Sequence, residues 1–393
     1  MTDSSARPLR VLVAPDKFKG SLTAVEAAEA IAAGVLDAAP DAVVRQMPIA
    51  DGGEGTLEAF AAAGAELETV AVSGPLGTTV EARWAVHGST VVIELAEASG
   101  LRLVTEPGPA HALTADTRGV GELMRIALDR GFRDIVVAVG GSASTDGGFG
   151  AIRELGLRVR DSADADIADV RSLSECATID VSGLDARLAD CRIVIATDVG
   201  SPLTGKTGAA RVFAPQKGAD ERAVGALEDR LNAWGRVLDA HADACVSAMP
   251  GVGAAGGFAA AFLAVGCAEV RSGADEIAAV TGIERAVRES DLVVIGEGSL
   301  DEQSLLGKGP VALAHLAHAA GSRVIAVCGR STLTRQQLSE AHISVLRTIV
   351  ELEPDPKASL SQAASLSRKA AARATIEASC SLASRPEGVV LDR

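Results

Sequence analysis

Residues 10–21 read RVLVAPDKFKGS, an apolar run that ends in a loop containing lysines and a glycine. The alanine-rich pattern that follows predicts a helix over Thr23–Ala38, with Thr23 as its N-cap and Glu26 at the capping-box position. A second apolar run, Val43–Pro48, predicts another strand, and a further alanine-rich helix comes after it. Strands that alternate with helices are typical of a parallel sheet, so the start of the chain indicates an α/β fold.

The end of the chain repeats this alternation. Apolar runs predict strands at 291–296, 323–328 and 343–350, and helical patterns predict helices near 310–320, 332–341 and 358–380. Between the two ends, residues 69–104 contain closely spaced strand patterns with glycine turns, which indicate an antiparallel or mixed sheet.

We therefore expect an α/β protein with two α/β domains. The first is a Rossmann-like parallel-sheet domain built from both chain ends, residues 1–68 and 288–393. The second is an inserted mixed-sheet α/β domain over residues 69–287. Ligands of such folds bind in a cleft at the carboxyl ends of the parallel strands, so we expect the site there.

Composition disfavours several kinds of partner. The 393-residue chain has a net charge of −15 and only 2% aromatic residues, which argues against nucleic-acid binding. Six cysteines occur without a C-x-x-C pair, and no histidines cluster at zinc-ligand spacing, so free thiols in a reducing compartment are expected. No apolar run has the length of a membrane span, and the N-terminus lacks an apolar signal core. We expect a cytoplasmic protein without a membrane partner; the sequence does not indicate its oligomeric state.

Two stretches match nucleotide-binding patterns by spacing alone. GSPLTGKT (200–207) fits the P-loop pattern, but Pro202 removes a backbone donor, and the following RVF (211–213) predicts extended chain where a P-loop needs a helix. GVGAAG (251–256) fits the dinucleotide pattern, but CVSAMP before it is a poor strand. We interpret the second stretch as close packing and the first as a loop that is not a P-loop.

Five loops share a composition that does indicate chemistry. Each follows an apolar run and combines glycines with a carboxylate or a lysine: PDKFKGS (15–21), ADGGEGT (50–56), GGSASTDGG (140–148), TDVGSPLTG (197–205) and GEGSLDEQSLLGK (296–308). Glycine-rich backbone binds anions, lysine adds positive charge, and aspartate can hold magnesium or accept a hydroxyl proton. Singly, each loop has a structural reading, since Asp51 could cap a helix and Asp146 could bond its own turn. Together they indicate phosphoryl transfer.

In order and spacing, these loops resemble the motifs of the bacterial glycerate kinase family. Further stretches that carry the resemblance are IELAEASGL (93–101), TRGVGEL (117–123), FAPQKGA (213–219) and GAAGGF (253–258). The chain departs from the family pattern at Ser144-Thr145, Phe149, Ser201 and Ala214. The resemblance implies the two-domain α/β fold and phosphorylation of D-glycerate by ATP with Mg²⁺, commonly to 2-phosphoglycerate.

On these motifs we place the following roles. The catalytic candidates are Lys17, Asp51 and Asp198, with Asp198 as the base that orients the attacking hydroxyl; Asp51 and Asp198 could exchange roles. The substrate-binding candidates are Lys19, Ser21, Gly52, Gly53 and Glu54. The nucleotide-binding candidates are Gly140, Gly141, Ser142, Asp146, Gly147 and Lys217. The magnesium candidates are Glu297 and Asp301.

Other functions stay open from the sequence. The closest alternatives are a kinase for another small hydroxy acid and a glycerate kinase that forms 3-phosphoglycerate. An NAD-dependent oxidoreductase would need GVGAAG to follow a strand. A non-catalytic sensor of the same fold would need no carboxylates, yet Asp51, Asp146, Asp198 and Asp301 are all present.

Overall fold

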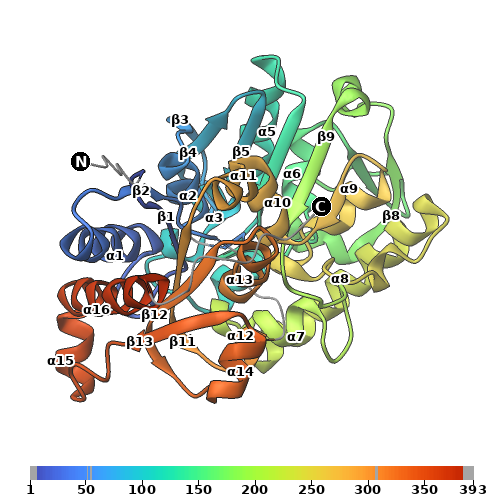
Figure 1. Ribbon diagram of the computed structural model, residues 1–393. Helices are drawn as coiled ribbons and strands as arrows, with labels where there is room; N and C mark the ends of the chain where they lie inside the picture. Colours follow the sequence, from blue (N-terminus) through green and yellow to red (C-terminus); the bar gives the residue numbers. More distant parts are fainter. Residues whose placement is uncertain (1–6, 51, 54, 306–308, 384–393) are drawn as a thin grey trace. The chain divides into compact units, whose positions relative to one another are not determined.

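The computed structural model describes residues 7–50, 52–53, 55–305 and 309–383 (Figure 1). The chain divides into two compact units. The first contains the described residues up to Ala50 and from Thr281 onward, and the second runs from Gly52 to Val280. The boundaries predicted from the sequence lie at 68/69 and 287/288. The structure assigns α2 (Thr56–Ala62) to the second unit, because this helix packs on three strands of that unit's sheet.

A five-stranded parallel sheet forms the centre of the first unit, in the order β13-β12-β11-β1-β2. Its strands are β1 (Arg10–Pro15), β2 (Val43–Gln46), β11 (Leu292–Leu300), β12 (Arg323–Ser331) and β13 (Ile343–Thr348). β1 pairs with β2 on one side and with β11 on the other, so the two ends of the chain meet within this sheet. The apolar runs of β1 and β11 are buried, as parallel strands covered on both faces require.

Helices cover this sheet, and the first of them begins as the sequence predicts. Thr23 and Glu26 form a capping box at the start of α1 (Ala24–Ala38). This helix packs along α16 (Ala363–Ala383), which Figure 1 shows beside it. The remaining helices of the unit are α11 (Ile283–Arg288), α12 (Glu302–Leu305), α13 (Gly309–Ala319), α14 (Arg335–Glu340) and α15 (Pro356–Ser361). The α/β fold with a parallel sheet is thereby confirmed.

The second unit contains a six-stranded mixed sheet in the order β10-β9-β6-β5-β4-β3. Its strands are β3 (Glu66–Ser73), β4 (Thr79–His87), β5 (Thr90–Glu94), β6 (Asp134–Ala138), β9 (Arg192–Ala196) and β10 (Glu269–Arg271). β5, β6, β9 and β10 run parallel, whereas β3, β4 and β5 pair antiparallel, which confirms the predicted mixed sheet. The strand pattern predicted to continue to Val104 is wrong beyond Glu94, because the chain there turns into a helix.

Helices and a small separate sheet complete the second unit. Besides α2, its α-helices are α3 (Leu95–Ser99), α4 (Pro109–Thr114), α5 (Arg118–Asp129), α6 (Phe149–Glu154), α7 (Ala209–Phe213), α8 (Glu221–Ala242), α9 (Ala259–Ala264) and α10 (Gly273–Thr281). Its 3₁₀ turns are η1 (Leu101–Leu103), η2 (Val170–Glu175), η3 (Ala186–Asp190), η4 (Pro215–Lys217), η5 (Val246–Ala248) and η6 (Ala254–Gly256). β7 (Arg158–Asp161) pairs antiparallel with β8 (Cys176–Asp180).

The core of the second unit is built around the few aromatic residues of the chain. Trp84, Trp234, Phe258 and Phe262 are fully buried. Phe149, one of the departures from the family pattern, meets Trp234 edge to face with ring centroids 6.2 Å apart. Such edge-to-face pairs add to the stabilisation that burial provides. The departure at Phe149 is therefore a core residue.

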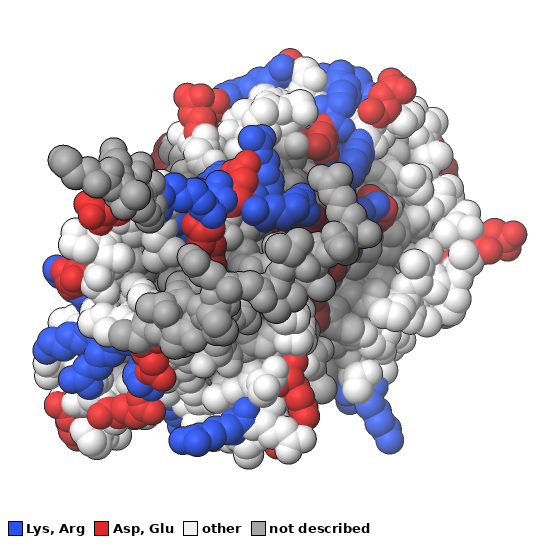
Figure 2. All heavy atoms as spheres, viewed as in Figure 1, with Lys and Arg blue, Asp and Glu red and all other residues white. Residues whose placement is uncertain are grey.

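Charged side chains of both signs are interspersed on the face that Figure 2 shows. Many described arginines pair with acids, as Arg285 does with Glu289 and Arg153 with Asp166. Exposed pairs of this kind contribute little stability individually. Among the helices that the structure describes, none combines the length and the apolar character needed to span a membrane.

Candidate active site

The predicted site residues fall into two groups, one in each unit. Lys17, Lys19, Ser21, Glu297 and Asp301 belong to the first unit. Gly52, Gly53, Gly140, Gly141, Ser142, Asp146, Gly147, Asp198 and Lys217 belong to the second. Asp51 and Glu54 lie outside the described residues. Within each unit most of the predicted residues follow parallel strands, whose carboxyl ends share one edge of the sheet.

The loop after β1 is a tight turn fixed on the neighbouring strand. Its first amide, Asp16 N–H, donates to the carbonyl of Gly296 in β11 over 2.8 Å. Phe18 is buried and anchors the turn, and the Ser21 hydroxyl donates to the Phe18 carbonyl over 3.1 Å. Lys19 is exposed at the top of this turn. The loop thus presents a lysine to solvent from a fixed backbone.

Glu297 lies within β11, and Asp301 follows directly after this strand. Asp301 Oδ1 accepts a hydrogen bond from Gln303 N–H at 2.9 Å, and its Oδ2 accepts one from the Ser299 hydroxyl at 3.3 Å. These bonds fix the carboxylate at the start of α12. In the ranges that the structure covers, no three histidine, cysteine or acidic side chains gather into a group that could hold a metal by themselves.

Asp146, in the loop after β6, is fully buried and satisfied by the protein itself. Its Oδ2 accepts from Thr117 N–H at 3.0 Å, the Thr117 hydroxyl at 2.7 Å and Gly150 N–H at 3.0 Å. Its Oδ1 accepts from Gly148 N–H at 3.2 Å. The carboxylate therefore joins the start of α5 to the start of α6 and supports the loop from below.

Lys217 lies under the same loop, with its side chain only 3% exposed. Its Nζ donates to the Ser142 hydroxyl over 2.8 Å and also to the carbonyl of Ser144. Burial lowers the pKa of Lys217 to about 7, although the nearby Asp146 charge acts in the opposite direction. The predicted nucleotide loop is thus held from beneath by a buried amine and a buried carboxylate.

Asp198 follows β9 and is exposed. Its Oδ1 accepts from Gly273 N–H at 3.1 Å and its Oδ2 from Ala274 N–H at 3.4 Å, so both oxygens face the start of α10. Gly52 lies at the same sheet edge: its carbonyl accepts from Gly140 N–H at 3.1 Å, and a Cβ at Gly52 would meet the Ala196 carbonyl oxygen at 2.9 Å. The structure therefore brings Asp198, Gly52 and Gly140 to one edge.

Glu94, at the end of β5, is a buried acid to which the sequence analysis gave no role. Leu57 N–H donates to its Oε2 over 3.4 Å. Burial raises the pKa of Glu94 to about 7, against the amide of Leu57, which lowers it. The signal in the sequence is the acid that directly follows three apolar residues in TVVIE (90–94), at the start of the stretch IELAEASGL. Buried acids with raised pKa values are common at functional sites, so Glu94 joins the candidates.

The two nucleotide-like stretches prove to be structural. A helix does follow GSPLTGKT, so the extended reading of RVF is wrong, but α7 has five residues and begins at Ala209. The Gly205 amide, which a P-loop would aim at phosphate, donates to Glu228 Oε1 over 2.7 Å. GVGAAG follows a 3₁₀ turn, and a Cβ at Gly253 would lie 2.1 Å from the Pro202 carbonyl oxygen. The interpretation of GVGAAG as close packing is confirmed.

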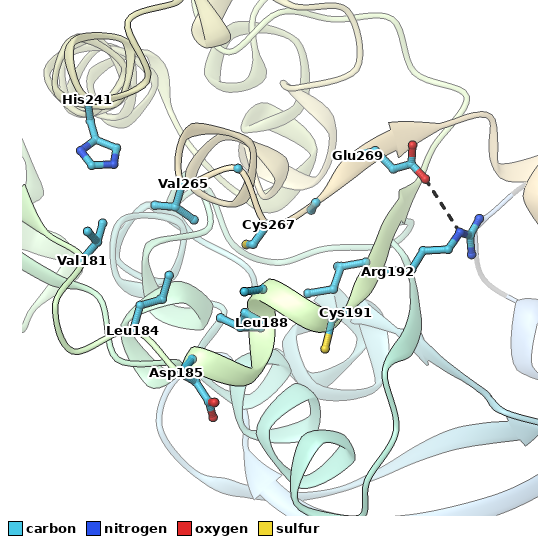
Figure 3. A pocket seen from close by; sticks show the side chains of 15 residues that line it. Val181, Leu184, Asp185, Leu188, Cys191, Arg192, His241, Val265, Cys267 and Glu269 are labelled. Carbon is cyan, nitrogen blue, oxygen red and sulfur yellow. Dashed lines mark ion pairs between the residues drawn. The ribbon is translucent and has the colours of Figure 1, made fainter.

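A cavity of about 620 Å³ lies elsewhere in the second unit, at the amino end of β9 (Figure 3). Cys191, Arg192, His241 and Cys267 are among the residues that line it, and Arg192 pairs with Glu269 at its rim over 3.9 Å. None of the predicted site residues lines this cavity. It is therefore separate from the sheet edge described above.

Comparisons with known proteins give a consistent result. The model of the glycerate kinase family matches residues 11–378. The chain is 40% identical to the glycerate 2-kinase of Escherichia coli (strain K12), over 88% of this chain and 92% of that protein. It is 39% identical to the glycerate kinase of Bacillus subtilis (strain 168), over 87% of this chain and 90% of that protein. A crystal structure described as glycerate kinase 2, from Salmonella typhimurium LT2, superposes with a TM-score of 0.81 at 36% identity, covering 96% of this chain and all of the other.

Proposed function

This chain belongs to the glycerate kinase family and is an enzyme of that family, and on this premise we propose that it transfers the γ-phosphoryl group of ATP to D-glycerate, releasing 2-phosphoglycerate and ADP. The observation that carries the proposal is the 40% identity to a glycerate 2-kinase over 88% of the chain. The glycine-rich loops at the sheet edges support it, because phosphoryl transfer depends mainly on positioning and on stabilising charge.

In this proposal, residues of the first unit bind the carboxylate of glycerate, the phosphoryl acceptor. Lys19 is exposed on a turn that Phe18 anchors, and Lys17 lies in the same turn. An ammonium group is a compact charge that suits a carboxylate. The Ser21 hydroxyl fixes the turn through its bond to Phe18, which makes it a support for the lysines. Asp51, Gly52, Gly53 and Glu54 are proposed to bind the hydroxyl groups of glycerate.

Asp198 is proposed as the catalytic base. The amides of Gly273 and Ala274 fix the orientation of its carboxylate, and the residue is exposed at the end of a strand. A carboxylate held in this way can accept the proton of the attacking hydroxyl as the new O–P bond forms. The amides of Gly140, Gly141 and Gly147 and the hydroxyl of Ser142 are proposed to receive the phosphate oxygens of ATP.

Glu297 and Asp301 are proposed to hold Mg²⁺. They fit this ion as a pair, because magnesium at kinase sites is bound by one or two carboxylates together with substrate phosphates and water. Each Asp301 oxygen holds one hydrogen bond and keeps a lone pair for a further contact. When bound, the ion would neutralise phosphate charge as the γ-phosphoryl group leaves ADP.

A coupled assay of ADP release with Mg-ATP and D-glycerate tests the function, and phosphorus NMR of the product identifies the phosphorylated hydroxyl. We expect a glycerate-dependent rate and the 2-phosphate. A product with the NMR signal of 3-phosphoglycerate would contradict the proposed position of transfer. ADP formation with another small hydroxy acid, and none with D-glycerate, would contradict the proposed acceptor.

A further inference from the structure

Ser142 has a fixed place at the edge of the second unit's sheet. The residues on either side of it are bonded to the segment after α3: Ala143 N–H donates to the Ser99 carbonyl over 2.8 Å, and Leu101 N–H donates to the Gly141 carbonyl over 2.9 Å. The backbone of Ser142 also forms an isolated β-bridge with Gly100. The backbone at Ser142 is therefore fixed on both sides.

Lys217 approaches this hydroxyl from beneath the loop, out of contact with solvent. Its side chain comes from η4 and is 3% exposed, so a dissolved nucleotide does not reach its amine. Within the described ranges Nζ forms no ion pair, and the nearby Asp146 carboxylate accepts its hydrogen bonds from Thr117, Gly148 and Gly150. Burying an amine without a counter-charge is costly, and an apolar residue would fill the same space at lower cost. A role in packing alone does not explain this lysine.

The direction of the hydrogen bond says what the amine does. In the structure Lys217 Nζ–H donates to Ser142 Oγ. The hydroxyl proton of Ser142 is then left to donate elsewhere, and no protein acceptor for it lies among the described residues. A hydroxyl that accepts from a polar donor becomes a better donor itself. Ser142 is thereby prepared to donate to an anionic oxygen.

We propose that Lys217 is a positioning residue that acts on the nucleotide through the Ser142 hydroxyl and does not touch phosphate itself. This inference rests on the proposed function, since it takes the 140–148 loop as the part that receives ATP. It assigns two different tasks to two residues that sequence reasoning had grouped together as nucleotide ligands. Ser142 contacts the phosphate, and Lys217 fixes the direction in which the Ser142 hydroxyl donates.

A double-mutant cycle on nucleotide binding tests the inference. The four proteins are the wild type, Ser142→Ala, Lys217→Met and the double variant, and calorimetry measures the Kd of magnesium with the non-hydrolysable β,γ-imido analogue of ATP. We expect each single variant to bind about tenfold more weakly, the size of one hydrogen bond to a charged group. The double variant should bind no more weakly than either single one, because both changes remove the same contact.

Arg230→Met serves as the matched control. Arg230 is also a buried cation, 5% exposed on α8, and its Nη1 has no hydrogen-bond partner in the described part of the chain. No bond joins it to Ser142, so we expect an unchanged Kd. Thermal unfolding of Lys217→Met and Arg230→Met separates loss of binding from loss of folding. If Lys217→Met does not fold, Lys217→Leu, which also removes the donor, replaces it in the cycle.

Three results would overturn the inference. Losses that multiply in the double variant would mean that Lys217 contacts the nucleotide independently of Ser142. Unchanged binding by Lys217→Met would mean that the lysine supports the structure of the loop and has no effect on nucleotide binding. A wild type that does not bind the analogue would remove Ser142 from the nucleotide site. A different pattern separates the two proposals. If the binding losses are non-additive but the wild type does not phosphorylate D-glycerate, the proposed acceptor is refuted, whereas the link between Lys217 and Ser142 is supported.

Discussion

The loops after β6 and β9 lie on neighbouring parallel strands and look alike in the sequence, yet their aspartates are used differently. Asp146 is fully buried and accepts four hydrogen bonds from its own protein. Asp198 is exposed and accepts two, both from the start of α10. Glu94, after β5, is the third case: it is buried like Asp146 but has few donors, and its pKa is raised to about 7 by burial.

A carboxylate beside glycines at a strand end can thus be either a support or a reactive group. What separates the two is the number of donors that the fold already directs at it. A saturated carboxylate is tied to its surroundings and stabilises the loop, whereas an exposed and oriented one can exchange a proton with a ligand. A substitution of Asp146 should therefore change stability, whereas a substitution of Asp198 should change the rate of catalysis.

Of the changes considered, Asp146→Ala should have the largest effect, and the property that it changes is the stability of the fold. The change leaves the amides of Thr117, Gly148 and Gly150 and one hydroxyl buried without an acceptor. We expect the free energy of unfolding to fall by about 3–5 kcal/mol, measured by urea denaturation. Asp198→Ala in the same experiment is the control. A loss at Asp146 of less than about 1 kcal/mol would mean that its carboxylate is no support.

Asp198→Ala should affect catalysis and leave folding nearly intact. Removal of a general base slows the chemical step by about 10²–10⁴-fold, so we expect kcat to fall in that range while the KM for ATP changes little. The coupled ADP assay gives both constants. Near-normal turnover would contradict Asp198 as the base, and Asp51 would then be the next candidate.

Glu94→Gln should change how stability depends on pH. The pKa of Glu94 is raised from 4.5 to about 7 by burial, so the folded state holds this proton more tightly than the unfolded chain does. The group's contribution is fully present below pH 4.5 and is lost as the pH rises through about 7. The glutamine variant should not show this loss. At pH 8 its free energy of unfolding should exceed that of the wild type by up to about 3 kcal/mol. Parallel urea unfolding curves for both proteins across pH 5–8 would contradict the assignment.

Lys206→Met should have the smallest effect. Lys206 occupies the lysine position of the P-loop pattern, but it is exposed, and the adjacent Gly205 amide is bonded to Glu228. We expect the KM for ATP to change by less than about twofold, since surface changes away from bonded groups are nearly neutral. A true P-loop lysine would be needed for activity, so a large loss of turnover would revive that reading.

Local patterns predicted the fold well, because the determinants are close together in the chain. The capping box of α1 spans Thr23 to Glu26, and the alternation of strands and helices indicates the parallel sheet at both ends. The roles of Asp146 and Lys217 could not be predicted in this way. Thr117 lies 29 residues from Asp146, and Ser142 lies 75 residues from Lys217, so only the folded chain brings these partners together. RVF was misread because packing around α7 overrides its weak local preference.

The pairing of β1 with both β2 and β11 has a consequence for synthesis of the protein. The second unit is one continuous stretch of chain, so its residues have all been made once the ribosome passes Val280. The first unit cannot complete its sheet until β11, β12 and β13 have followed. Limited proteolysis of a released chain that ends before β11 should find the second unit resistant and β1 cleavable. Each newly made molecule thus carries an unfinished sheet edge for most of its translation, and such an edge is prone to pair with other chains.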